Sequence, residues 1–191
     1  ALFNIARIME KKGDDRSAED YYRKSVEASP NEFSLNNLGS LLFKRGDLSG
    51  ALKALQRAVQ VNPRHVSAHA NLGNVWMELG NPAKAVAAHR TAISLDPNIA
   101  DARYNLSKIL KEQGDFVGAA AQLMSVVRIK PGDAEAQYEL GMMLFEKLGD
   151  LKGAARHVGI AAKLEPLDKV NHMNLGTIFM NMENFGLAVA S

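Results

Sequence analysis

The chain has 191 residues, of which 47% are hydrophobic and 23% are charged, and its formal net charge is +2. This balance is ordinary for a folded protein and excludes strong overall electrostatic attraction to nucleic acid or to a membrane surface. There is no cysteine, which excludes disulfides, thiolate metal sites and a cysteine nucleophile and is compatible with a cytoplasmic compartment.

Three residue types recur along the chain at the same spacing, with intervals of 33, 34, 34 and 35 residues. The prolines of this series are Pro30, Pro63, Pro97, Pro131 and Pro166, and the glycines are Gly13, Gly46, Gly80, Gly114 and Gly149. The alanines are Ala18, Ala51, Ala85, Ala119, Ala154 and Ala188. A fixed period near 34 residues predicts one supersecondary unit that is copied along the chain and stacked into a solenoid.

The period divides the chain into six units that form a single array. In chain order they are residues 1–31, 32–65, 66–99, 100–133, 134–168 and 169–191. The first lacks its opening residues and the last is cut in its second half, so we expect the chain to be a piece of a longer protein. The absence of a signal or membrane segment therefore carries little weight.

The unit over residues 66–99 shows why each repeat is predicted to be a helical hairpin. Leu72, Trp76 and their apolar neighbours have helical spacing over residues 66–79. Gly80 then suits a left-handed C-cap, because glycine has no Cβ to clash. Asn81 provides an N-cap for a second helix, which Pro97 ends.

The N-cap recurs in all six units, as Asp14, Asp47, Asn81, Asp115, Asp150 and Asn184. In the last unit Glu183 stands where the others have glycine. Small residues recur on the first helices, at Ala6, Gly39, Gly73, Ser107, Gly141 and Gly176. We expect them to face the alanines of the second helices, which lets the helix axes approach to ~8–10 Å.

The string Asn-Leu-Gly at residues 37–39, 71–73 and 174–176 resembles the first-helix signature of tetratricopeptide repeats. Together with the spaced alanines and prolines, the resemblance covers the whole chain. It implies an all-α fold, a right-handed superhelical solenoid of antiparallel helix pairs. It also implies that the first helices line a concave groove in which partners bind.

Projection of the helical period onto the first helices gives a predicted peptide-binding surface. It consists of Asn4, Arg7, Asn37, Phe43, Lys44, Asn71, Asn74, Met77, Tyr104, Asn105, Lys108, Tyr138 and Asn174. Five of these asparagines share one place in their units, namely Asn4, Asn37, Asn71, Asn105 and Asn174. A carboxamide matches the donor and acceptor of an extended peptide backbone. This asparagine series resembles the ladder in protein O-linked N-acetylglucosamine transferases, although Glu139 interrupts it; the alternative is that the amides are merely solvated.

Charges on the same face differ between units. The basic residues on this face are Arg7, Lys44, Lys108 and Lys111, whereas Glu135, Glu139 and Glu146 make the fifth unit acidic. This polarity would orient a ligand of mixed charge. The alternative is a solvated helix surface. The carboxylate clamp that holds chaperone C-termini in related repeats needs a lysine four residues before an asparagine. No unit supplies that pair, so binding of chaperone tails is not expected.

No catalytic or cofactor site is predicted. His65 and His69 are four residues apart, but no third metal ligand accompanies them. No phosphate-binding loop and no serine–histidine–acid arrangement is evident. We therefore expect no enzyme activity, no metal and no cofactor.

The predicted function is a scaffold that binds an extended peptide or a partner protein, with neither nucleic-acid binding nor membrane insertion. Two alternatives remain open. In the first, the chain is the substrate-recruiting part of a larger enzyme, such as a glycosyltransferase. In the second, it acts in assembly, by self-association through apolar residues of the incomplete sixth unit, namely Met180, Phe185 and Leu187.

Overall fold

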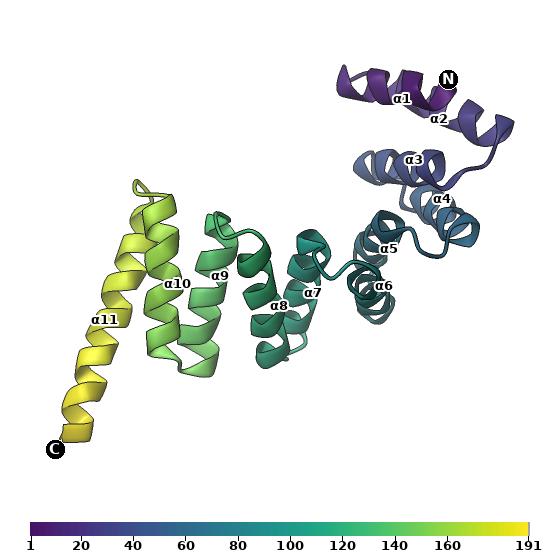
Figure 1. Ribbon diagram of the computed structural model, residues 1–191. Coiled ribbons are helices and arrows are strands. Elements are labelled where there is room, and N and C mark those ends of the chain that lie inside the picture. Colours follow the sequence, from purple (N-terminus) through teal and green to yellow (C-terminus); the bar gives the residue numbers. More distant parts are fainter. Residues whose placement is uncertain (191) are drawn as a thin grey trace. The chain divides into compact units, whose positions relative to one another are not determined.

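The computed structural model describes the backbone of residues 1–190 and the side chains of residues 1–183. Every regular element in this part of the chain is a helix (Figure 1). The expected all-α fold of helix pairs is therefore confirmed. The chain divides into two compact units, Ala1–Ala102 and Arg103–Ser191.

The first compact unit consists of three consecutive helix pairs. The first helices are α1 (Leu2–Lys11), α3 (Glu32–Lys44) and α5 (Val66–Glu78), and the second helices are α2 (Asp15–Ala28), α4 (Leu48–Val61) and α6 (Pro82–Leu95). Each first helix packs against the second helix that follows it, and α2 and α4 also pack against the next first helix. Each apolar helix face is thus buried by its sequence neighbours.

The second compact unit follows the same pattern. Its helices are α7 (Ala100–Glu112), α8 (Phe116–Ile129), α9 (Ala134–Met143), η1 (Leu144–Leu148), α10 (Leu151–Leu164) and α11 (Lys169–Ala190). Helix α9 packs against α8 and α10, and α10 packs against α11, as the side-by-side green and yellow ribbons of Figure 1 show. Helix α7 begins at the end of the first unit.

The predicted turns form at five of the six positions. The five turn glycines all have positive φ, from 68° at Gly149 to 82° at Gly46. The Asp or Asn after each glycine is the N-cap of the second helix. Asp47 Oδ1, for example, accepts a hydrogen bond from the backbone N–H of Gly50 at 2.8 Å. Each hairpin corner therefore rests on one glycine and one polar cap.

Loss of one cap gives a first testable prediction. We expect Asp47→Ala to lower the free energy of unfolding by about 1 kcal/mol, because the N–H of Gly50 loses its acceptor. Asp47→Asn keeps an acceptor, as Asn81 does in the next hairpin, and is expected to be nearly neutral. Urea denaturation of both variants measures the difference, and equal loss in the two would contradict a capping role.

A π-helix explains the single interval of 35 residues. Element η1 continues α9 and carries the chain to Gly149. The N–H of Asp150 bonds to the carbonyl of Leu144, six residues back, whereas the N–H of Asp47 bonds to Leu42, five residues back. The extra residue is accommodated by a wider helical turn, so the hairpin corner keeps its form.

The last unit departs from the sequence prediction. A turn at Glu183 and an N-cap at Asn184 were expected, but α11 is one helix from Lys169 to Ala190. The prediction of a turn and a second helix in the sixth unit is therefore wrong. Glu183 accounts for the difference, because a residue with a Cβ disfavours the left-handed conformation that ends the other first helices. The side chains of Asn184, Phe185, Leu187 and Ala188 lie outside the described residues.

The small residues of the first helices lie at close helix crossings where a second helix faces them. A Cβ added to Gly39 would lie 2.5 Å from Leu55 Cγ and 3.3 Å from the carbonyl of Ala51. At Gly141 it would lie 3.2 Å from the carbonyl of Ala154. The expected contact between the glycine and alanine series is confirmed at these two crossings. At Gly176 no atom of the part of the chain that the structure describes lies within 4 Å of an added Cβ.

Candidate functional site

All thirteen predicted site residues lie on first helices, and each is at least partly exposed. In the first compact unit they are Asn4, Arg7, Asn37, Phe43, Lys44, Asn71, Asn74 and Met77; in the second they are Tyr104, Asn105, Lys108, Tyr138 and Asn174. The two groups form the first-helix faces of their respective units.

A chain of hydrogen bonds crosses the first-helix face of the first unit. The Tyr22 hydroxyl donates to Glu10 Oε2 at 2.7 Å and accepts from Asn37 Nδ2 at 3.1 Å. Asn37 Oδ1 accepts from Asn36 Nδ2 at 3.1 Å, and Asn36 Oδ1 accepts from Asn71 Nδ2 at 3.0 Å. Side chains of α1, α2, α3 and α5 are thereby joined in one network.

This network changes the interpretation of the asparagine series. Asn37 and Asn71 each use one N–H in the network, and each keeps a second N–H and spare acceptor capacity. Their amide planes are held before any ligand arrives, which lowers the entropy lost on binding. Sequence reasoning missed Tyr22 and Asn36; the signal was a tyrosine where the next unit has the apolar Leu55.

Burial, followed by the hydrogen bond to Glu10, raises the pKa of Tyr22 to about 12. The phenol therefore stays protonated at neutral pH and remains the donor to Glu10. Since the ring is fully buried, the same residue anchors α2 in the core and orients the Asn37 amide.

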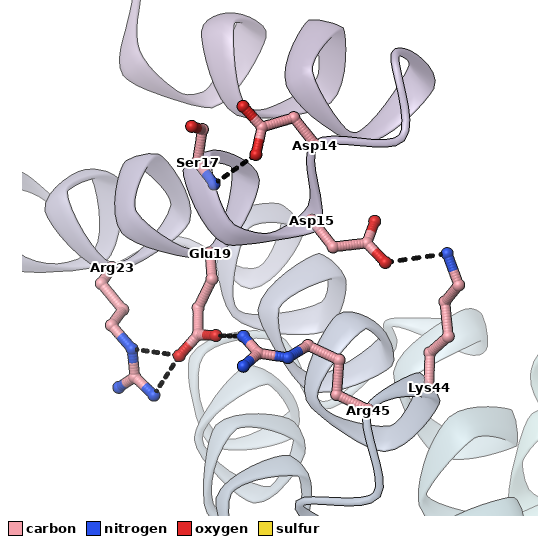
Figure 2. Close-up of polar contacts among 7 residues, drawn as sticks. All are labelled: Asp14, Asp15, Ser17, Glu19, Arg23, Lys44 and Arg45. Atoms are coloured by element: carbon pink, nitrogen blue, oxygen red, sulfur yellow. Dashed lines mark hydrogen bonds and ion pairs between the residues drawn. The ribbon is translucent and has the colours of Figure 1, made fainter.

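The basic residues at the end of α3 are held by acidic residues of α2 (Figure 2). Lys44 Nζ lies 3.0 Å from Asp15 Oδ2. Glu19 pairs with both Arg23 and Arg45. Lys44, which we predicted to face a ligand, thus has an intramolecular partner. Exposed pairs of this kind contribute little to stability.

In the second unit the predicted residues also pair with each other or with acidic neighbours. Tyr104 donates to Glu135 Oε1 at 2.8 Å, and Lys108 Nζ lies 5.4 Å from the centre of the Tyr104 ring. Burial first, and then the bond to Glu135, raises the pKa of Tyr104 well above its usual range. Asn174 Nδ2 donates to the Tyr138 hydroxyl at 2.7 Å.

A cleft of about 410 Å³ opens on the first-helix face of the second unit. Its lining comprises Lys108, Lys111, Glu112, Phe116, Glu139 and Lys147. Three of these, Lys108, Lys111 and Glu139, were placed on this face from the sequence. Phe116 and Lys147 were missed because α8 and η1 reach the cleft only through the fold. Lys147 Nζ lies 5.4 Å from the centre of the Phe116 ring, so the cleft joins an apolar surface to cations.

The histidine pair serves local structure. His65 Nδ1 accepts from the N–H of Ala68 at 3.1 Å and caps α5. His69 Nε2 lies 2.9 Å from the carbonyl of Pro63 and donates to it. Among the described residues no group of three or more His, Cys, Asp or Glu side chains has the arrangement of a metal site. In the same part of the chain no helix combines the length and apolarity needed to cross a membrane.

Three family models, each described as tetratricopeptide repeat, match residues 1–32, 36–98 and 77–141. The chain belongs to the tetratricopeptide repeat family. Proteins of this family are interaction scaffolds in general, and that coarse role extends to this chain. None of the curated proteins matches the sequence.

Many solved structures share the fold. A crystal structure of MamA is 26% identical, with a TM-score of 0.75 over 85% of this chain and 95% of that one. The structure of YrrB, described as a tetratricopeptide repeat protein with an unusual peptide-binding site, is 20% identical with a TM-score of 0.71 over 92% and 90%. PilF of Pseudomonas aeruginosa is 21% identical with a TM-score of 0.79 over 92% and 80%.

Proposed function

We propose that this tetratricopeptide repeat protein is a non-catalytic scaffold that binds an extended peptide or partner protein on its first-helix faces. The observation that carries the proposal is the cleft lined by Lys108, Lys111 and Glu139. It lies on the face that the repeat pattern selects, and it combines an apolar wall with both signs of charge. The peptide-binding site named for YrrB is consistent with such a role.

The side chains suggest how a peptide would be held. Asn37 and Asn71 offer free donor and acceptor capacity to a peptide backbone, and their orientation is already fixed. Lys108 and Lys111 would attract carboxylates of the ligand, while Glu139 would attract a cation. Binding through the backbone would tolerate many sequences, and the charges would set the direction of the bound chain.

Selection of peptides from a random displayed library tests the proposal. We expect selected peptides to lose at least about tenfold in affinity for the triple variant Lys108→Ala, Lys111→Ala, Glu139→Ala, which removes three charged side chains of the cleft, because each lost hydrogen bond contributes ~1 kcal/mol. Methylation of the peptide's backbone nitrogens should weaken binding to the same degree. It removes the N–H groups that would donate hydrogen bonds to the asparagine side-chain carbonyls.

Arg90→Ala, an exposed change on the second helix α6, serves as the control and should leave affinity unchanged. Undiminished binding to the triple variant would refute the first-helix faces as the site. The roles as a recruiting region of a larger enzyme and as a self-association module stay predictions.

A further inference from the structure

The first unit has a concave feature of its own, away from the first-helix face and between the second helices α2 and α4. Its volume is about 310 Å³. Leu35, Leu38 and Leu42 of α3 form its floor and are only 2%, 6% and 4% exposed. Val26 of α2 and Ala54 of α4 line its walls. We call this feature the α2–α4 groove.

The next repeat shows what this groove lacks. Thirty-four residues after Leu42 stands Trp76, and thirty-four residues after Gly50 stands Lys84. Trp76 packs against the hydrophobic core, and Lys84 Nζ lies 4.2 Å from the centre of its ring. The third repeat thus fills the equivalent place with its own indole and closes it with a cation. The second repeat, with leucine and glycine there, leaves the place open.

The rim of the α2–α4 groove is basic. Arg23 of α2 and Lys53 and Arg57 of α4 line it, against the single acidic residue Glu27. Arg23 is paired with Glu19. Lys53 and Arg57 are exposed and four residues apart, so they project from one side of α4. Neither forms an ion pair with any described side chain.

We propose that the α2–α4 groove is a docking site for a partner polypeptide that inserts a large aromatic side chain flanked by carboxylates. The aromatic ring would occupy the place that Trp76 fills in the next repeat, over the leucine floor. Lys53 and Arg57 would lie beside it, as Lys84 lies over Trp76, and would pair with the flanking carboxylates. The site is independent of the first-helix faces and of the function proposed for them.

Methyl NMR spectra of the full chain test the proposal directly. The probe is a short acetylated and amidated peptide with one central tryptophan between glutamates. We expect saturable shifts of the Val26, Leu38 and Leu42 methyl signals, with a dissociation constant of about 1 mM or tighter. Peptides with alanine in place of tryptophan, or lysines in place of the glutamates, should bind at least about tenfold more weakly. Absence of shifts, or equal shifts with the lysine peptide, would overturn the proposal.

Two variants locate the site. Lys53→Glu with Arg57→Glu changes only exposed side chains and should weaken binding at least about tenfold. Lys152→Glu with Arg156→Glu makes the same charge change on α10, also on exposed residues four apart, and should have little effect. If both double variants lose binding equally, the peptide responds to net charge alone and the proposal is wrong.

A variant that fills the groove with the side chains of the next repeat provides a second test. Leu42→Trp with Gly50→Lys copies the Trp76 and Lys84 pair into the groove and should abolish the shifts of Val26 and Leu38. The charge variants decide the matter if this variant fails to fold. Met77 of α5 and Met142 of α9 are partly exposed methionines of the first helices. Peptide-induced shifts confined to their methyl groups would contradict docking in the α2–α4 groove but support binding on the first-helix faces, so the two proposals fail separately.

Discussion

Replacement of Gly141 by alanine is expected to destabilise the protein by about 1–3 kcal/mol, although alanine is the better helix former. The new Cβ would lie 2.6 Å from Val158 Cγ2 and 2.9 Å from the backbone nitrogen of Val158. A side chain can rotate away, but the backbone of α10 cannot, so α9 and α10 would have to separate. Separation would leave unfilled space between the two helices, and the side chains that line this space would lose dispersion contacts.

The same substitution at Gly176 is the matched control. Gly176 has the same place in its repeat as Gly141, yet no atom of the described residues lies within 4 Å of an added Cβ. Gly176→Ala is therefore expected to stabilise the protein by about 0.5–1 kcal/mol, because glycine in a helix loses more backbone entropy than alanine. Urea denaturation followed by far-ultraviolet circular dichroism compares the two. Stabilisation by both alanines would show that α9 and α10 do not cross closely at Gly141.

The second large effect concerns His89 and acid. The imidazole is fully buried, and neither ring nitrogen has a hydrogen-bond partner among the described residues. It lies against Gly73, where an added Cβ would come within 2.5 Å of the ring. Its place in the repeat is the one that Leu55 and Leu123 fill in other units. A buried polar group without a partner destabilises the folded state, because it has lost its water.

Burial lowers the pKa of His89 from 6.5 to about 4. In the unfolded chain the imidazole takes up a proton as the pH falls below about 6.5, whereas in the folded protein it stays neutral until about pH 4. The unfolded state therefore binds more protons in this window, and the protein loses stability as the pH falls. Between about pH 7.5 and pH 4 the loss from this one group is about 3 kcal/mol.

His89→Leu is expected to remove that loss and to stabilise the protein at neutral pH by about 1–2 kcal/mol. Both proteins contain the same carboxylates, so the difference between their stability curves isolates His89. Thermal or urea denaturation at a series of pH values measures it. Parallel curves for the two proteins would mean that the histidine is not buried in its neutral form.

Much of the fold follows from local chemistry in the sequence. The turn glycines adopt positive φ and the Asp or Asn after each one caps a helix, because these roles depend on residues within one helical turn. The interval of 35 residues marked the repeat that contains the π-helix η1. The sequence did not show that Glu183 would leave α11 unbroken, since the cap at the next position pointed to a turn.

The placement of candidate site residues on first helices likewise follows from the sequence, but their partners do not. Asn37 and Asn71 were selected by their repeat position, whereas their link through Asn36 and Tyr22 depends on helices that meet only in the folded chain. Lys44 was predicted to face a ligand and is paired with Asp15 of the preceding hairpin. Such pairs join residues from different helices, and spacing along one helix carries no information about them.

The sequence by itself thus determined the hairpin unit and its corners, because backbone conformation and capping are decided within a few residues. Only the tertiary structure decided which spaces between the helices are filled by side chains. Whether the place between two second helices is closed by Trp76 or left open beside Leu42 depends on side-chain volume across three helices. The same holds for His89, whose ring is buried and unpaired only because Gly73 and its neighbours enclose it.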